Sequence, residues 1–141
     1  RTRFQRTGQS LAIILDGRQV PIVEYPEFDD VRLGTFESGP VAVYREWRRT
    51  HTPEEPPPGE GESRVDALYR YTRGFERMLT EEADHLLAVL HDVPIRFMLN
   101  GVQSADPLDG PVRGVENAEP HHLTEADIDR GLSAMRDRLG M

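Results

Sequence analysis

A run of apolar residues that ends directly at a histidine constrains the fold of this chain more than any other feature. Residues 86–90, Leu-Leu-Ala-Val-Leu, have the length and composition of a strand covered on both faces, as in a parallel sheet. His91 follows this run, and Pro94 stands where the first turn of a helix tolerates proline. The order of strand, histidine and helix predicts an α/β fold with His91 at the sheet edge where ligands collect. Taken alone, the position of His91 favours a histidine that caps the strand and hydrogen-bonds to the backbone.

Other segments supply the helices of this fold. Residues 41–49 carry apolar side chains at helical spacing, and Ser63 caps a long helix with one continuous apolar face. Thr124 and Asp127 form a second capping pattern in front of the last helix. The proline-rich residues 50–61 between the first two helices predict a solvated loop.

Two short apolar segments near the start of the chain complete the prediction. Residues 20–23 favour a strand, whereas residues 11–15 fit a helix or a strand by their periodicity. Helices that alternate with strands, without internal repeats, predict a three-layer α/β/α sandwich. The length of 141 residues fits a single domain, residues 1–141.

Charge and composition exclude several classes of partner. The net charge of −8 argues against binding to nucleic acid or to an anionic membrane, so an anionic substrate needs a local group of arginines. There is no cysteine for a disulfide or a thiolate metal site. No apolar run has the length of a membrane span, and no signal-peptide pattern is present, so we expect a cytoplasmic protein. We expect neither a metal nor another cofactor.

Two segments, residues 89–96 around His91 and residues 2–10 around Arg6, resemble motifs of the histidine phosphatase superfamily, the phosphoglycerate-mutase-like proteins. Residues 89–96, Val-Leu-His-Asp-Val-Pro-Ile-Arg, are similar to the family's second-histidine motif, in which an apolar strand ends in a histidine and an isoleucine–arginine pair follows. Residues 2–10, Thr-Arg-Phe-Gln-Arg-Thr-Gly-Gln-Ser, are similar to the segment whose arginine contacts the phosphoryl group. The resemblance implies that Arg6 and His91 bind a phosphoryl group.

Further matches follow in the family's order. Residues 28–37 resemble the acidic loop that supplies the proton donor, and Asp30 matches the donor glutamate; Asp92 and Glu27 remain alternatives. Residues 61–63, Gly-Glu-Ser, resemble the entry to the helix before the second-histidine strand. Residues 115–118 are similar to the family's closing strand.

The family's nucleophile motif, Arg-His-Gly at the end of the first strand, does not occur in this sequence. The resemblance therefore implies an N-terminally incomplete, phosphoglycerate mutase-like fold whose nucleophilic histidine lies upstream of Arg1. It implies a phosphomonoester hydrolase that acts on a small phosphorylated substrate through a phosphohistidine intermediate. The alternatives are a noncatalytic relative that binds a phosphorylated ligand and, less favoured, a phosphoglycerate mutase. A homodimer is possible.

Overall fold

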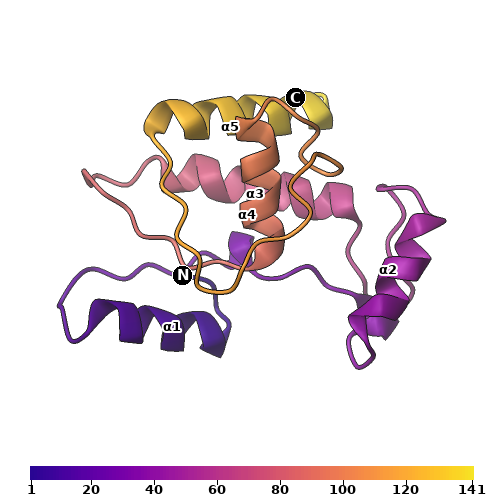
Figure 1. Ribbon diagram of the computed structural model, residues 1–141, viewed down its shortest axis with the longest axis horizontal. Helices are drawn as coiled ribbons and strands as arrows, with labels where there is room; N and C mark the ends of the chain where they lie inside the picture. Colours follow the sequence, from indigo (N-terminus) through magenta and orange to yellow (C-terminus); the bar gives the residue numbers. More distant parts are fainter.

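The computed structural model describes all 141 residues, and it contains helices but no β-strand (Figure 1). The prediction of a three-layer α/β/α sandwich is therefore wrong for this structure. The elements are α1 (Gln5–Leu15), η1 (Pro26–Phe28), η2 (Gly34–Phe36), α2 (Val41–Arg49), α3 (Arg64–Met78), α4 (Asp92–Val102) and α5 (Glu125–Leu139), where η denotes a short 3-10 helix.

The main core lies where α3, α4 and α5 pack against one another (Figure 1). The apolar faces predicted for α3 and α5 point into this core, because Leu68, Phe75, Leu132 and Met135 are all buried. The short helix η1 packs against α3 and adds Phe28 to the same cluster. The buried members are Tyr25, Phe28, Ala67, Leu68, Tyr71, Phe75, Phe97, Met98, Leu108, Leu132 and Met135.

Helices α4 and α5 approach each other closely at a pair of glycines. A Cβ atom added at Gly101 would lie 2.7 Å from the carbonyl oxygen of Gly131. A Cβ atom added at Gly131 would lie 2.2 Å from the sulfur of Met98. Hydrogen in place of a methyl group at both positions therefore allows the two helices to pack at this distance.

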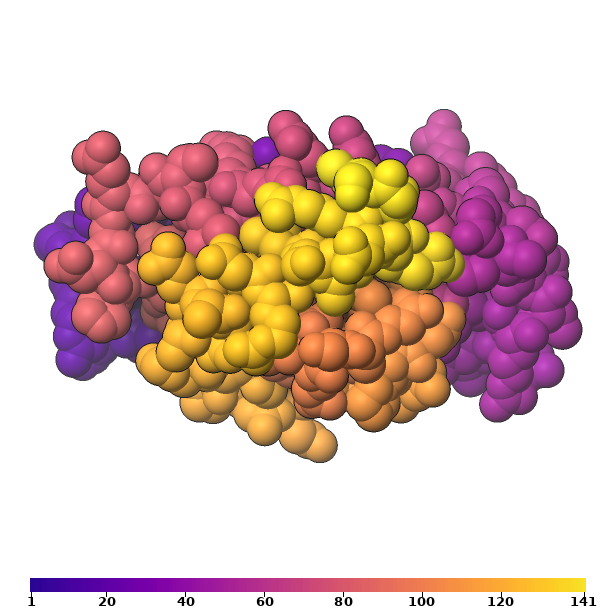
Figure 2. All heavy atoms as spheres, turned by 90° about the horizontal axis from the view of Figure 1, so that it is seen from above, coloured from indigo at the N-terminus to yellow at the C-terminus, as the bar shows by residue number.

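Helices α1 and α2 lie at opposite ends of the molecule, one on each side of the core (Figures 1 and 2). Helix α2 has the predicted bounds, and its Tyr44 and Trp47 rings pack with Phe36. The ambiguous residues 11–15 are helical, as the second half of α1. No helix is long and apolar enough to cross a membrane.

Three segments predicted as strands are extended or irregular instead. Residues 84–90 make no backbone–backbone hydrogen bond, and Leu86 and Leu87 are 47% and 58% exposed. Residues 20–23 and 115–118 are likewise outside any regular element. A strand exists only where a neighbouring backbone pairs with it along several residues, and none of these segments has such a continuous partner.

One isolated contact has the pattern of a parallel strand pair. The N-terminal amine of Arg1 donates to the carbonyl of Val23 at 3.0 Å, and the carbonyl of Arg1 accepts from the N–H of Tyr25 at 2.8 Å. The pattern ends after this pair of bonds. The apolar composition of the segments thus favours strands, but their pairing is not formed.

Candidate functional site

Three side chains from distant parts of the chain meet beside the first turn of α4. Nη2 of Arg6 donates to Oδ2 of Asp30 at 2.8 Å and lies 2.8 Å from Nδ1 of His91. Nδ1 of His91 lies 3.7 Å from the same Asp30 oxygen. The structure therefore brings together the three residues that the sequence singled out, and we call them the Arg–Asp–His cluster.

Each member of the cluster is held at the end of a short element. His91 is the N-cap residue of α4, where an extended backbone turns its ring inward, and only 6% of the residue is exposed. Arg6 lies in the first turn of α1. Asp30 follows η1, whose Phe28 anchors the loop in the core. The rings of Phe4 and His91 pack in a T-shaped arrangement, with 4.9 Å between the ring centroids.

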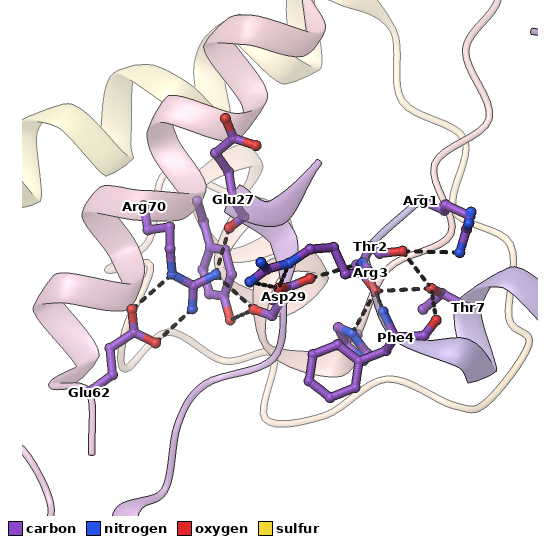
Figure 3. Close-up of polar contacts among 11 residues, drawn as sticks. Arg1, Thr2, Arg3, Phe4, Thr7, Glu27, Asp29, Glu62 and Arg70 are labelled. Atoms are coloured by element: carbon purple, nitrogen blue, oxygen red, sulfur yellow. Dashed lines mark hydrogen bonds and ion pairs between the residues drawn. The ribbon is translucent and has the colours of Figure 1, made fainter. Parts of the chain in front are cut away.

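A buried ion pair fixes the loop that carries Asp30 (Figure 3). Arg70 of α3 donates to both carboxylate oxygens of Glu62, at 2.8 and 2.6 Å. The same guanidinium donates to the backbone carbonyls of Glu27 and Asp29, at 2.7 and 2.8 Å. Burial opposes the charge of Arg70, but the hydrogen bonds of Glu62 together with the charges of Glu62 and Tyr71 outweigh it, so the pKa of Arg70 is raised. We call this arrangement the Arg70 clamp.

The carboxylate of Asp29, next to Asp30, binds Arg3 near the start of the chain (Figure 3). It accepts from the backbone N–H of Arg3 at 3.0 Å and from Nε of Arg3 at 2.7 Å. This contact brings the segment before α1 against the η1 loop, so that Arg6 and Asp30 lie side by side.

The electrostatics of the cluster favour the neutral form of His91. Burial lowers the pKa of His91; the carboxylate of Asp30 acts in the opposite direction, and the guanidinium of Arg6 lowers the pKa further. Arg6 itself is open to solvent, and its Nε and Nη1 groups have no protein acceptor. A guanidinium with unused donors can bind two oxygens of a tetrahedral anion.

Glu27 and Asp92, the alternatives to Asp30 as proton donor, contact other residues. Glu27 forms an ion pair with Arg77 at 2.9 Å. One oxygen of Asp92 accepts from the backbone N–H of Val115 at 2.9 Å, and the other faces Arg96 at 3.6 Å. Among the three carboxylates considered as proton donors, Asp30 is the one that contacts Arg6 and faces His91.

The remaining histidines stand apart from the cluster. His51 stacks on the ring of Trp47 with 4.1 Å between the centroids, and His121 faces Glu119. His85 and His122 form no hydrogen bond or ion pair with Arg6, Asp30 or His91. No group of three or more histidine, aspartate or glutamate side chains is arranged to hold a metal ion.

Two features of the site were not predicted from the sequence. The first is the Arg70 clamp, since residues 62 and 70 are eight apart and do not have the spacing of a helical ion pair. The second is a pair of buried hydroxyls, Thr2 and Thr7, behind the imidazole of His91. Only the resemblance of residues 2–10 to a known segment gave a signal for the second feature.

Comparison with known proteins supports the reading of the motifs. The family model of the histidine phosphatase superfamily (branch 1) matches residues 2–137. A search of curated proteins and a search of solved structures each found no match. The family match covers the whole Arg–Asp–His cluster and nearly all of the sequence. The chain therefore belongs to the histidine phosphatase superfamily.

Proposed function

We propose that the Arg–Asp–His cluster binds the phosphoryl group of a small phosphomonoester and supports its hydrolysis through a phosphohistidine intermediate. One observation carries the proposal: Arg6 contacts both Asp30 and His91 while part of its guanidinium stays free for an anion. Family membership agrees with phosphatase or mutase chemistry in general.

Each member of the cluster has a separate role in this proposal. A nucleophilic histidine, which lies outside these 141 residues, attacks phosphorus, and the bond from phosphorus to the ester oxygen breaks. Arg6 neutralises the phosphoryl oxygens, and His91 donates a hydrogen bond to one of them. Asp30 protonates the leaving oxygen and then accepts a proton from the water that releases phosphate from the nucleophile.

Hydrolysis of p-nitrophenyl phosphate tests the proposal in the protein with whatever sequence its gene encodes upstream of Arg1. We expect Arg6→Gln and His91→Asn each to lower kcat/KM by about 100-fold or more, because each removes a group that stabilises transferring charge. Arg45→Gln is the control, since Arg45 is exposed on α2 and has no ion pair. Activity within a few-fold of the unmodified protein in either cluster variant would refute the assigned roles.

A second function is supported by the other histidines within these 141 residues, since none of them contacts the Arg–Asp–His cluster. In this alternative, the chain binds a phosphorylated ligand without turnover. Acid-labile, alkali-stable labelling by a phosphorylated substrate distinguishes the two, because only the enzyme forms a phosphohistidine. Phosphate binding without labelling or hydrolysis supports the noncatalytic alternative.

A further inference from the structure

A chain of three polar contacts, two buried and one partly buried, leads away from the cluster behind His91. Nε2 of His91 lies 3.1 Å from the hydroxyl of Thr2, which is fully buried. The Thr2 hydroxyl lies 2.9 Å from the hydroxyl of Thr7, and Thr7 donates to the carbonyl of Phe4 at 2.8 Å (Figure 3). The imidazole is thus held on both nitrogens, by Arg6 on one side and by hydroxyls on the other.

The proton positions along this chain follow from what each group can donate. A guanidinium has donors and no acceptor, so Nδ1 of His91, 2.8 Å from Arg6, must present its lone pair. The proton of the neutral ring is therefore on Nε2 and is donated to Thr2. Thr2 then donates to Thr7, and Thr7 donates to the Phe4 carbonyl, which can only accept.

Donation in the opposite direction, from the Thr2 hydroxyl to Nε2 of His91, is excluded because a guanidinium has no acceptor. If Thr2 donated to Nε2, the ring proton would be on Nδ1 and would face the N–H group of Arg6. The one carboxylate nearby, Asp30, is 3.7 Å from Nδ1, beyond hydrogen-bond distance. Two N–H donors, on Nδ1 of His91 and on Arg6, would then face each other without an acceptor between them.

We propose that the Thr2–Thr7 hydroxyl pair holds His91 in the Nε2–H tautomer, so that an anion bound at the Arg–Asp–His cluster draws one proton from solvent onto Nδ1. A neutral ring in this tautomer offers the anion a lone pair, which repels it. A ring protonated at Nδ1 offers a donor instead. Thr2 is thus a positioning residue that couples anion binding to proton uptake, a property beyond the proposed hydrolysis.

The charges around the ring are consistent with such coupling. Asp30 and Asp29 favour the imidazolium, whereas burial, Arg6 and Arg70 oppose it, and the balance lowers the pKa in the free protein. A dianion beside Nδ1 adds negative charge and compensates Arg6, so the pKa of His91 rises on binding. Between the pKa of the free protein and that of the complex, binding takes up one proton.

Nitrogen-15 NMR of the histidine rings tests the tautomer without any turnover. In the ligand-free protein near pH 8, we expect His91 to show a protonated Nε2 and an unprotonated Nδ1. Thr2→Ser should keep this pattern. In Thr2→Val the fraction of the Nε2–H form should fall, because Nε2 loses its acceptor and only the contact of Arg6 with Nδ1 still favours that tautomer. A protonated Nδ1 in the unmodified neutral protein would overturn the proposal, whether or not Thr2→Val folds.

Sulfate binding measured against pH tests the coupling, because sulfate keeps the same charge across this range. We expect affinity to rise about tenfold for each unit of pH decrease within the window between the two pKa values. Thr2→Ser should keep this slope and Thr2→Val should flatten it. A uniform loss of affinity with an unchanged slope would show a merely structural Thr2. An unchanged slope in Thr2→Val would overturn the proposal. The proposal would also be overturned if sulfate affinity in the unmodified protein did not depend on pH, or if sulfate did not bind. Since neither readout needs hydrolysis, failure of the proposed enzyme activity remains a separate result.

Discussion

Replacement of Arg70 by leucine tests whether the Arg70 clamp stabilises the fold. The guanidinium is the partner of Glu62, whose side chain is only 4% exposed, and it also binds the carbonyls of Glu27 and Asp29. Leucine fills part of the space but donates nothing. The buried carboxylate of Glu62 then either stays charged without a cationic partner or takes up a proton.

The size of the stability loss expected for Arg70→Leu follows from the burial of the Glu62 carboxylate. Removal of one partner of a buried ion pair typically lowers stability by about 3–5 kcal/mol, because a desolvated charge is left alone. The two carbonyls of the η1 loop also lose a charged donor, and those losses partly overlap with the first. A domain has about 5–15 kcal/mol in total, so Arg70→Leu is expected to remove a large share of it.

Urea unfolding followed by circular dichroism at the helical band measures this loss. Arg73→Leu is the matched control on the same helix, since Arg73 is 59% exposed in its pair with Glu76 and should change stability by less than about 1 kcal/mol. The double variant Glu62→Leu/Arg70→Leu should be more stable than Arg70→Leu alone, because no charge remains buried. Equal effects of Arg70→Leu and Arg73→Leu, or a double variant less stable than Arg70→Leu, would refute the reasoning.

Three further predictions concern the helices and His91. Thr124→Ala should lower the free energy of unfolding by about 1 kcal/mol, through loss of the capping box of α5, while Thr124→Ser should retain it in the same urea titration. Gly131→Ala should lower the melting temperature through a loss of about 1–3 kcal/mol, because its methyl group overlaps Met98; an unchanged midpoint would contradict the close packing. The folded-state pKa of His91 is lowered, so the unfolded chain takes up a proton first as pH falls through about 6.5; the free energy of unfolding should decrease there, and less so in His91→Gln.

The helices could be predicted because their signals are local. Ser63 accepts from the N–H of Asp66 and begins α3, and Thr124 and Asp127 cap α5 reciprocally, as their order in the sequence indicated. Apolar spacing also placed Leu68 and Leu132 in the core. A cap and a periodic face need only a few neighbouring residues, so a single sequence contains all the information.

Whether the apolar segments pair into a sheet could not be predicted in the same way, because a strand depends on a partner that is distant in the sequence. Residues 86–90 have the composition of a buried strand, but composition does not supply the neighbour that takes up their N–H and C=O groups. The run therefore lies extended, with Leu86 and Leu87 exposed. Residues 20–23 are also unpaired except at Val23, whose carbonyl makes the segment's single backbone hydrogen bond to Arg1.

The cluster itself forms without a sheet, because each member is placed by a contact that does not involve strand pairing. His91 is oriented by the start of α4 and by Thr2, and Asp30 is placed by Phe28 and by the Arg70 clamp on its neighbours. Arg6 follows from the contact of Arg3 with Asp29. The placement of Asp30 thus depends on Arg70 of α3, and that of His91 depends on the hydroxyls of Thr2, before α1, and Thr7, within α1. Loss of the clamp should displace the carboxylate while the tautomer of His91 stays as it is, which separates the two halves of the site by measurement.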